Sequence, residues 1–203
     1  MKIGLCILIL TMAGLGAIPK ASPSNLSLQQ QRWNAATVRV EKQSETRWIA
    51  RKIERNQARY ETISKSANVP WQIVASIHSM ECGLNFGQHL HNGDPLTART
   101  RQVPAGRPKT GRPPFSFEES AKDALEYDGL NRVPWRDFNR ALDALEAFNG
   151  MGYRKRGIPS PYLWSGTNLE RPGKFVADGK WSATAGSSQI GIVPILKELR
   201  AVW

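Results

Sequence analysis

The segment from Val69 to Asp94, VPWQIVASIHSMECGLNFGQHLHNGD, constrains the fold more than any other part of the chain. It opens with Pro70, whose fixed φ suits the first turn of a helix. The apolar residues that follow have the three- and four-residue spacing of a one-sided helix: Ile73, Val74, Ile77 and Met80. Gly83 is placed to end that helix. We therefore expect an amphipathic helix between Pro70 and Gly83.

Glu81 lies near the end of this helix, three residues after His78 and therefore on the same face. No Lys or Arg occurs between Val69 and Arg99 to neutralise it locally. A carboxylate at the apolar end of a helix is costly unless it is paired, protonated or used in chemistry. Glu81 is therefore a candidate catalytic acid, although an exposed helix-end Glu is the more frequent situation.

The composition narrows the class of protein and the charge of its partner. With 203 residues, a hydrophobic fraction of 40% and seven Trp, the chain is long enough and apolar enough for one folded domain. Its formal net charge of +11 favours an anionic partner, such as nucleic acid, an anionic membrane or an acidic cell-wall polymer. Because zinc-finger, RRM and KH signatures are absent, we do not expect nucleic acid to be that partner.

The first twenty residues have the layout of a secretory signal peptide. Lys2 precedes an uncharged, largely apolar run from Ile3 to Ile18, with small residues near its end. We predict a signal peptide over 1–20, cleaved between 16 and 22. The run is short for a membrane span, so we expect no stable membrane insertion after cleavage. The mature protein is then exported, to the periplasm or the extracellular space.

Signal cleavage would remove Cys6 and leave Cys82 without an internal disulfide partner. Beside apolar helix residues, such a Cys is usually a small buried hydrophobe. The alternative is a cysteine nucleophile with His78, four residues earlier, as its base.

The sequence predicts that the rest of the chain is mainly helical, with irregular loops. We expect a polar, flexible arm over 21–44 and then a helical pattern from Glu45 to Ser66. Its predicted core residues are Trp48, Ile49, Ile53, Tyr60 and Ile63. Ser116 and Glu119 form a capping box that predicts a helix from about Phe117 to Tyr127.

Two further helices are predicted near the C-terminus. Asp137 is a candidate N-cap for a helix with a clear apolar stripe, which Asn149 and Gly150 end. A short helix should follow from about Pro194 to Val202. The fold class is thus mainly α, a single domain over 45–203 with long irregular loops and at most a minor β element.

Two loop segments carry residues suited to binding. The first, from Arg99 to Pro114, contains five basic residues and no acidic one, so it is either a solvated loop or a clamp for an anionic polymer. The second, from Gly150 to Lys180, is rich in Gly and Pro and contains Tyr153, Tyr162, Trp164 and Phe175. These aromatic side chains could line a sugar-binding groove, where a ring covers the apolar face of a pyranose, or could cover the core.

Glycoside cleavage needs an acid that keeps its proton near neutral pH, which a partly apolar pocket provides. Glu81 fits, with Ile77, Met80 and Leu84 near it in sequence. Asp94 follows thirteen residues later and could hold the water of an inverting mechanism. On spacing alone, the run NGDP favours the alternative that Asp94 is an Asx-turn residue.

Three histidines also suggest a metal site: His78, His89 and His91, with Glu81 beside them. The zinc-protease order H-E-x-x-H is absent, and an isolated H-x-H in a turn is a weak signal. We therefore expect no metal, and we expect these histidines to form hydrogen bonds around the site.

Several pieces taken together resemble the lysozyme-like superfamily, and more narrowly its soluble lytic transglycosylase and goose-type lysozyme group. Glu81 at the end of an apolar helix is followed later by AFNGMGY, from Ala147 to Tyr153. Further pieces in the same order are HSME, HNGDPL, VPAGRP, PFSFEESA, SPYLWSGTN and GKFVADG. The resemblance covers about 69–179.

The resemblance implies a lysozyme-like fold with Glu81 as general acid and base. It places Asn149 and Tyr153 near the reacting sugars, and the spacing from Glu81 to Asp94 is similar to the Glu–Asp spacing of goose-type lysozymes. His78, Tyr162 and Trp164 are our further candidates for substrate contacts.

The predicted function is that of an exported cell-wall enzyme, a lytic transglycosylase or muramidase. It would act as a monomer without a cofactor and cleave the MurNAc-β-1,4-GlcNAc bond of peptidoglycan glycan strands. Two alternatives remain. The chain could be a non-catalytic wall-binding protein on the same fold, or a metal-dependent hydrolase using His78, His89 and His91.

Overall fold

The computed structural model describes residues 23–177 and 179–201, so the predicted signal peptide at 1–20 lies outside the described residues. The described part contains nine α-helices and one two-stranded sheet, which confirms the mainly-α prediction with its minor β element. The chain divides into two compact units. The first unit is Asn56–Asn131, and the second combines the described residues up to Arg55 with those from Arg132 onward.

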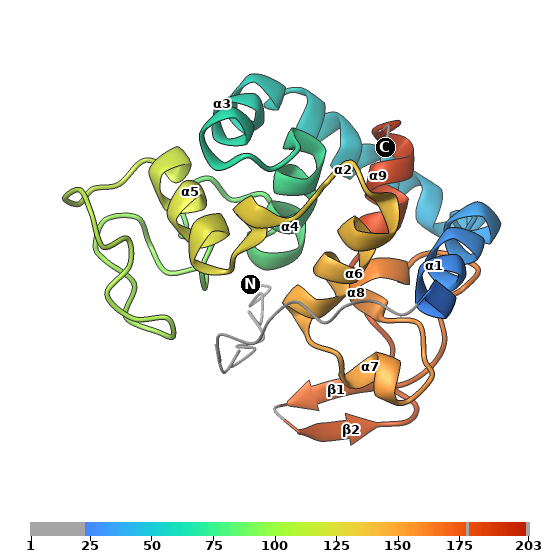
Figure 1. Cartoon of the computed structure of the whole chain (residues 1–203). Helices are drawn as coiled ribbons and strands as arrows, with labels where there is room; N and C mark the ends of the chain where they lie inside the picture. The colour runs from blue at the N-terminus through green and yellow to red at the C-terminus, as the bar shows by residue number, and fades with distance from the viewer. Residues whose placement is uncertain (1–22, 178, 202–203) are drawn as a thin grey trace. The chain divides into compact units, whose positions relative to one another are not determined.

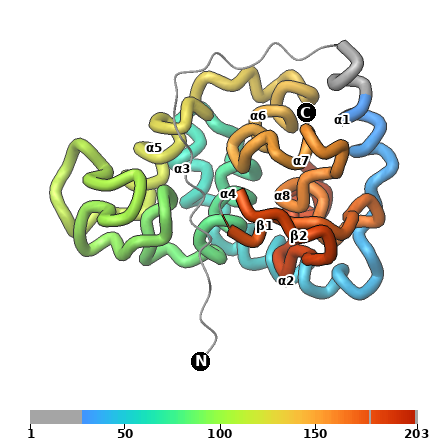
Figure 2. The backbone as a smooth tube through the Cα atoms, turned by 90° about the horizontal axis from the view of Figure 1, so that it is seen from below, coloured from blue at the N-terminus to red at the C-terminus, as the bar shows by residue number. Residues whose placement is uncertain are grey.

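Three helices form the first unit: α3 (Gln57–Ala67), α4 (Trp71–Cys82) and α5 (Phe117–Tyr127). Helix α3 packs against both α4 and α5 (Figure 1). As predicted, α4 begins directly after Pro70 and ends at Gly83, and its buried face includes Ile73, Val74 and Ile77. The connection from 83 to 116 consists of loops and turns (Figure 2).

Local and long-range contacts fix α5 at its N-terminus. The Ser116 side chain accepts a hydrogen bond from the Glu119 N–H, and the Glu119 side chain accepts one from the Ser116 N–H, which confirms the predicted capping box. Arg59 of α3 makes a two-pronged ion pair with Glu118, with Nε–Oε1 and Nη2–Oε2 distances of 2.6 and 3.1 Å. This pair ties α5 to α3.

The second unit is built from segments on both sides of the first in sequence. Helix α1 packs on α6, α2 packs on α9, and α8 contacts both α6 and α9. Its elements are α1 (Pro23–Ala35), η1 (Val40–Lys42), α2 (Gln43–Glu54), α6 (Phe138–Asn149), α7 (Gly152–Lys155), α8 (Pro161–Trp164), β1 (Lys174–Ala177), β2 (Lys180–Ser182) and α9 (Ile192–Glu198). The short helix η2 (Leu130–Arg132) spans the sequence junction between the units.

The described part of the predicted arm forms α1, η1 and the first two residues of α2. Gln29 is buried, and its Nε2 donates to Glu146 Oε2 of α6 over 3.0 Å. The Trp33 ring contacts Phe138 edge to face, with ring centroids 5.2 Å apart. A segment of polar sequence can pack here because a buried carboxylate accepts a hydrogen bond from its buried amide nitrogen.

The predicted single helical stretch from Glu45 to Ser66 is two helices, α2 and α3, separated at Arg55 and Asn56. Ile49 and Ile53 face the core as predicted, but Trp48 does not, since its side chain is 58% exposed. At about 100° per residue, Trp48 points roughly 140° away from Ile53 on the helix circumference. The two positions therefore cannot share one buried face.

The last helix is shorter than the predicted Pro194–Val202 and lies earlier in the chain: it begins at Ile192 and ends at Glu198. Pro194 is compatible with this start because N–H groups in the first turn have no intrahelical acceptor. Within 23–177 and 179–201, no helix has the length and apolarity needed to cross a bilayer.

Candidate functional site

Glu81 lies in the last turn of α4, next to the sharply bent chain that ends the helix. Its side chain is half-buried. Gly83 and Leu84 both have left-handed backbones, with φ values of 57° and 60°, and their N–H groups both donate to the His78 carbonyl. A left-handed conformation is unfavourable for Leu, and the burial of the Leu84 side chain, which is 4% exposed, holds it there. The backbone directly after Glu81 is thus closely specified.

His78 is part of the core of the first unit, which corrects its predicted role as a substrate contact. Its exposed fraction is 0%, and its Nδ1 lies 3.0 Å from the Tyr60 hydroxyl. Its ring lies 4.1 Å from that of Phe117 and 4.8 Å from that of Phe86, centroid to centroid. A sugar cannot reach a side chain that is fully enclosed in this way.

Asp94 organises the loop that follows it. Its Oδ2 accepts three hydrogen bonds: from the Arg101 N–H (2.7 Å), the Gln102 N–H (3.0 Å) and the Asn92 side chain (3.1 Å). Burial alone would raise the pKa of Asp94, but these donors outweigh it and hold the pKa below its ordinary value. The Asn92 Oδ1 in turn accepts from the Asp94 N–H, as expected for an Asx turn. These contacts agree with the turn-residue alternative.

The histidines considered as metal ligands form hydrogen bonds with other residues of the chain. His89 Nε2 donates to the Ala98 carbonyl and its Nδ1 lies 2.8 Å from Ser120 Oγ, so both nitrogens are engaged. The Cys82 Sγ donates to the His89 carbonyl rather than facing a base. Within the described residues, no three His, Cys, Asp or Glu side chains converge as a metal site would require.

His91 belongs to a buried charge cluster with Asp123 and Arg107. Asp123 Oδ2 accepts from His91 Nε2 and from Arg107 Nε, each over 2.8 Å. Burial lowers the pKa of His91 from 6.5 to about 4, against the opposing effect of Asp123. His91 Nδ1 is buried without a hydrogen-bond partner among the described residues, so a second ring proton would find no acceptor there. Sequence reasoning missed Asp123, because no local pattern indicates a partner 32 residues away.

Two of the five basic side chains in the 99–114 loop are held within the first unit. Arg99 Nη2 donates to the Gly111 carbonyl, and Arg107 binds Asp123. Arg101, Lys109 and Arg112 are exposed. Arg99 and Arg107 therefore anchor the loop to the first unit, while its exposed basic side chains give it a cationic surface.

The remaining predicted site residues belong to the second unit. Asn149 is the last residue of α6 and is half-buried. Tyr153 of α7 accepts a hydrogen bond at its hydroxyl from the Phe175 N–H over 3.2 Å, and burial raises its pKa. Tyr162 and Trp164 of α8 are 6% and 0% exposed. They cover the core, so for these two the sugar-groove prediction is replaced by its alternative.

Comparison with protein-family models, with curated proteins and with solved structures found no match to this chain.

Proposed function

We propose that the chain is an exported peptidoglycan-cleaving glycosidase, a lytic transglycosylase or muramidase, with Glu81 as its general acid and base. The observation that carries this proposal is the placement of Glu81: a half-buried carboxylate in the last turn of a helix whose preceding turns are buried, followed by two left-handed residues. A partly desolvated acid on a rigid element is what glycosidic-bond protonation needs. The cationic surface of the chain suits an anionic wall polymer.

In this mechanism Glu81 donates its proton to the glycosidic oxygen as the bond from the MurNAc C1 breaks. The cation-like C1 is then captured by the O6 hydroxyl of the same sugar, and the Glu81 carboxylate takes the proton that O6 releases. The product has a 1,6-anhydro end, and no water is consumed. The contacts of Asp94 favour this route, because its Oδ2 is already occupied by three donors.

A second candidate is a non-catalytic wall-binding protein. It is favoured by the burial of four predicted sugar contacts, His78, Tyr153, Tyr162 and Trp164, which leaves Asn149 as the predicted sugar contact that is only half-buried. The metal-hydrolase alternative is not proposed, because both nitrogens of His89 are engaged by the protein.

Mass spectrometry of muropeptides released from purified peptidoglycan tests the proposal. We expect soluble fragments with 1,6-anhydro ends. Reducing ends would indicate hydrolysis, and would give Asp94 the role of holding the attacking water. Peptidoglycan binding without release of any fragment would contradict the enzyme and leave the wall-binding candidate.

A further inference from the structure

Helix α2 presents a cationic face with one exposed aromatic ring to solvent. At about 100° per residue, Ser44, Trp48, Arg51 and Arg55 fall in one narrow stripe, and Arg47 lies beside it. The opposite side of α2 is buried, through Thr46, Ile49, Ala50 and Ile53. We call the five exposed residues the α2 face.

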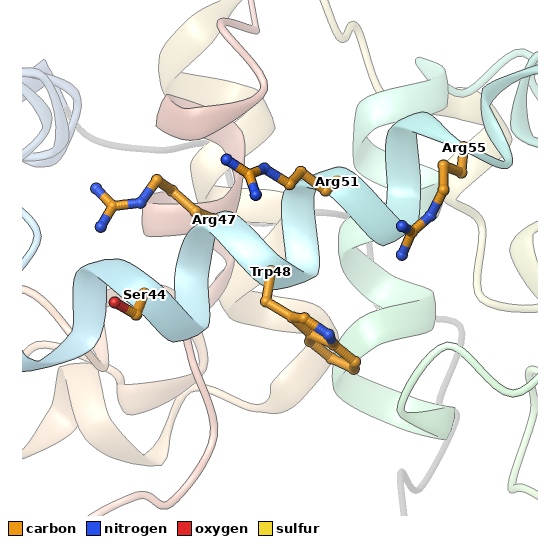
Figure 3. Close-up of a pocket in the computed structure, with 5 residues that line it drawn as sticks. All are labelled: Ser44, Arg47, Trp48, Arg51 and Arg55. Carbon is orange, nitrogen blue, oxygen red and sulfur yellow. The ribbon is translucent and has the colours of Figure 1, made fainter.

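The α2 face encloses a shallow hollow of about 370 Å³, lined by Ser44, Arg47, Trp48, Arg51 and Arg55. In Figure 3, Arg47 and Arg51 extend toward the left of the view, while Trp48 and Arg55 extend downward from the helix. The Lys52 ammonium lies 5.4 Å from the centre of the Trp48 ring. This cation–π contact favours one orientation of the ring, with little loss of its exposure.

The charge on this face is not neutralised within the described residues. Arg47, Arg51 and Arg55 are exposed and take part in none of the ion pairs of the described part of the chain. Of the two acidic residues in α2, Glu45 is paired with Lys42. Glu54 lies about 60° from Arg51 around the helix and takes part in none of the ion pairs of the described residues. Three arginines around an exposed Trp are complementary to a ligand that has both a ring and carboxylates.

We propose that the α2 face is an accessory binding site for uncleaved peptidoglycan strands. The Trp48 ring covers the apolar face of one sugar, and the arginines bind carboxylates of the peptide stems. The stripe from Ser44 to Arg55 is about 16 Å long at 1.5 Å per residue, so it can follow an extended strand over more than one sugar. The inference rests on the proposed function for the identity of the polymer.

The α2 face suits two other anionic partners, a membrane and single-stranded nucleic acid, less well. A membrane-binding helix turns a broad apolar face toward the lipid, whereas the apolar face of α2 is buried and Trp48 is the one large apolar side chain in the hollow. Single-stranded nucleic acid is bound on successive aromatic platforms, and this hollow has one. Binding to lipid vesicles and to a single-stranded oligonucleotide is therefore measured beside binding to peptidoglycan in the test below.

Co-sedimentation with purified peptidoglycan tests the site, with Glu81→Gln in every sample so that the polymer stays intact. We expect Trp48→Ala, and separately Arg47→Glu with Arg51→Glu, to weaken binding about tenfold. Arg136→Glu is the matched control, because Arg136 is an exposed arginine of the second unit outside the α2 face and should have a smaller effect. Amidating the carboxylates of the peptidoglycan should remove the difference between the arginine variant and its parent.

Equal binding by the parent and Trp48→Ala, at equal thermal stability, would overturn the proposal. Binding that depends on Trp48 with phosphatidylglycerol vesicles or a single-stranded oligonucleotide, but not with peptidoglycan, would also overturn it. The test is separable from the proposed function, since binding is measured without cleavage. If the otherwise unaltered chain releases no fragments while Trp48 still governs binding, the enzyme proposal fails and the accessory site stands.

Discussion

Glu81 and Asp94 are both carboxylates of the first unit, but their surroundings suit different tasks. Glu81 is half-buried in the last turn of α4. Asp94 accepts three hydrogen bonds at one oxygen and thereby fixes the start of the 99–114 loop. At the scale of single residues, we therefore propose Glu81 as the group that transfers the proton, and a structural role for Asp94.

The roles of Asp94 can be separated by substitution. Asp94→Ala removes the acceptor for two backbone N–H groups and should lower the free energy of unfolding by about 1 kcal/mol. Asp94→Asn keeps an acceptor oxygen, so it should cost less and still release anhydro-ended fragments. Urea denaturation and product analysis measure both. Loss of release by Asp94→Asn at unchanged stability would instead show that Asp94 holds the attacking water.

His91 should make stability depend on pH in a defined window. Its pKa is lowered to about 4 in the folded protein, so between about pH 6.5 and pH 4 the unfolded chain binds a proton that the folded chain does not. Stability should therefore fall as the pH is lowered through this window, by up to about 3 kcal/mol. The groups that set this pKa around the ring are Asp123, Arg107 and His89.

The measurement is the urea midpoint of the parent and of His91→Gln at several pH values within that window. The variant should be less stable near neutral pH and should lose less stability on acidification. Parallel curves for the two proteins would mean that His91 does not carry the effect.

At the scale of elements, the start of α5 offers a clear test. Ser116→Ala removes the acceptor for the Glu119 N–H and should destabilise the protein by about 1 kcal/mol. Thr110→Ala is the control, because Thr110 is exposed and makes no hydrogen bond among those of the described residues. Chemical denaturation compares the two, and equal stabilities would show that the capping box contributes little here.

Helix ends set by neighbouring residues were predictable from the sequence. Pro70, Ser116 and Asp137 each act within a few residues of themselves, and each stands at the start of a helix as predicted. The break between α2 and α3 was not predicted, although Asn56, a residue type favoured at N-caps, marks it.

Contacts between distant parts of the chain could not be predicted in this way. The burial of His78 depends on Tyr60 and Phe117, and the packing of α1 depends on Glu146 of α6. Trp48 is among the core residues predicted from the helical pattern of 45–66, whereas its position around α2 places it outside the buried face. Hydrophobic residues are buried on average, but whether a single residue in a helix is buried depends on its position around the helix axis.

At the scale of the whole molecule, the net charge of +11 predicts that the proposed binding to peptidoglycan depends on salt. Binding to purified peptidoglycan should weaken steadily as salt is raised from about 50 to 500 mM, because the Debye length falls from above 10 Å to a few ångströms. Co-sedimentation of the Glu81→Gln protein measures this without cleavage. Binding that does not change with salt would show that the net charge plays no part.

The most direct test of Glu81 as the catalytic acid compares fragment release from purified peptidoglycan by the wild-type protein, Glu81→Gln and Glu126→Gln. Glu126 is an exposed glutamate on α5, and its pair with Lys122 contributes little, so its amide variant controls for loss of a carboxylate. We predict release by the wild type and by Glu126→Gln, and a loss of at least about a hundredfold in Glu81→Gln at unchanged melting temperature. Equal release by all three proteins would contradict the assignment of Glu81 as the catalytic acid.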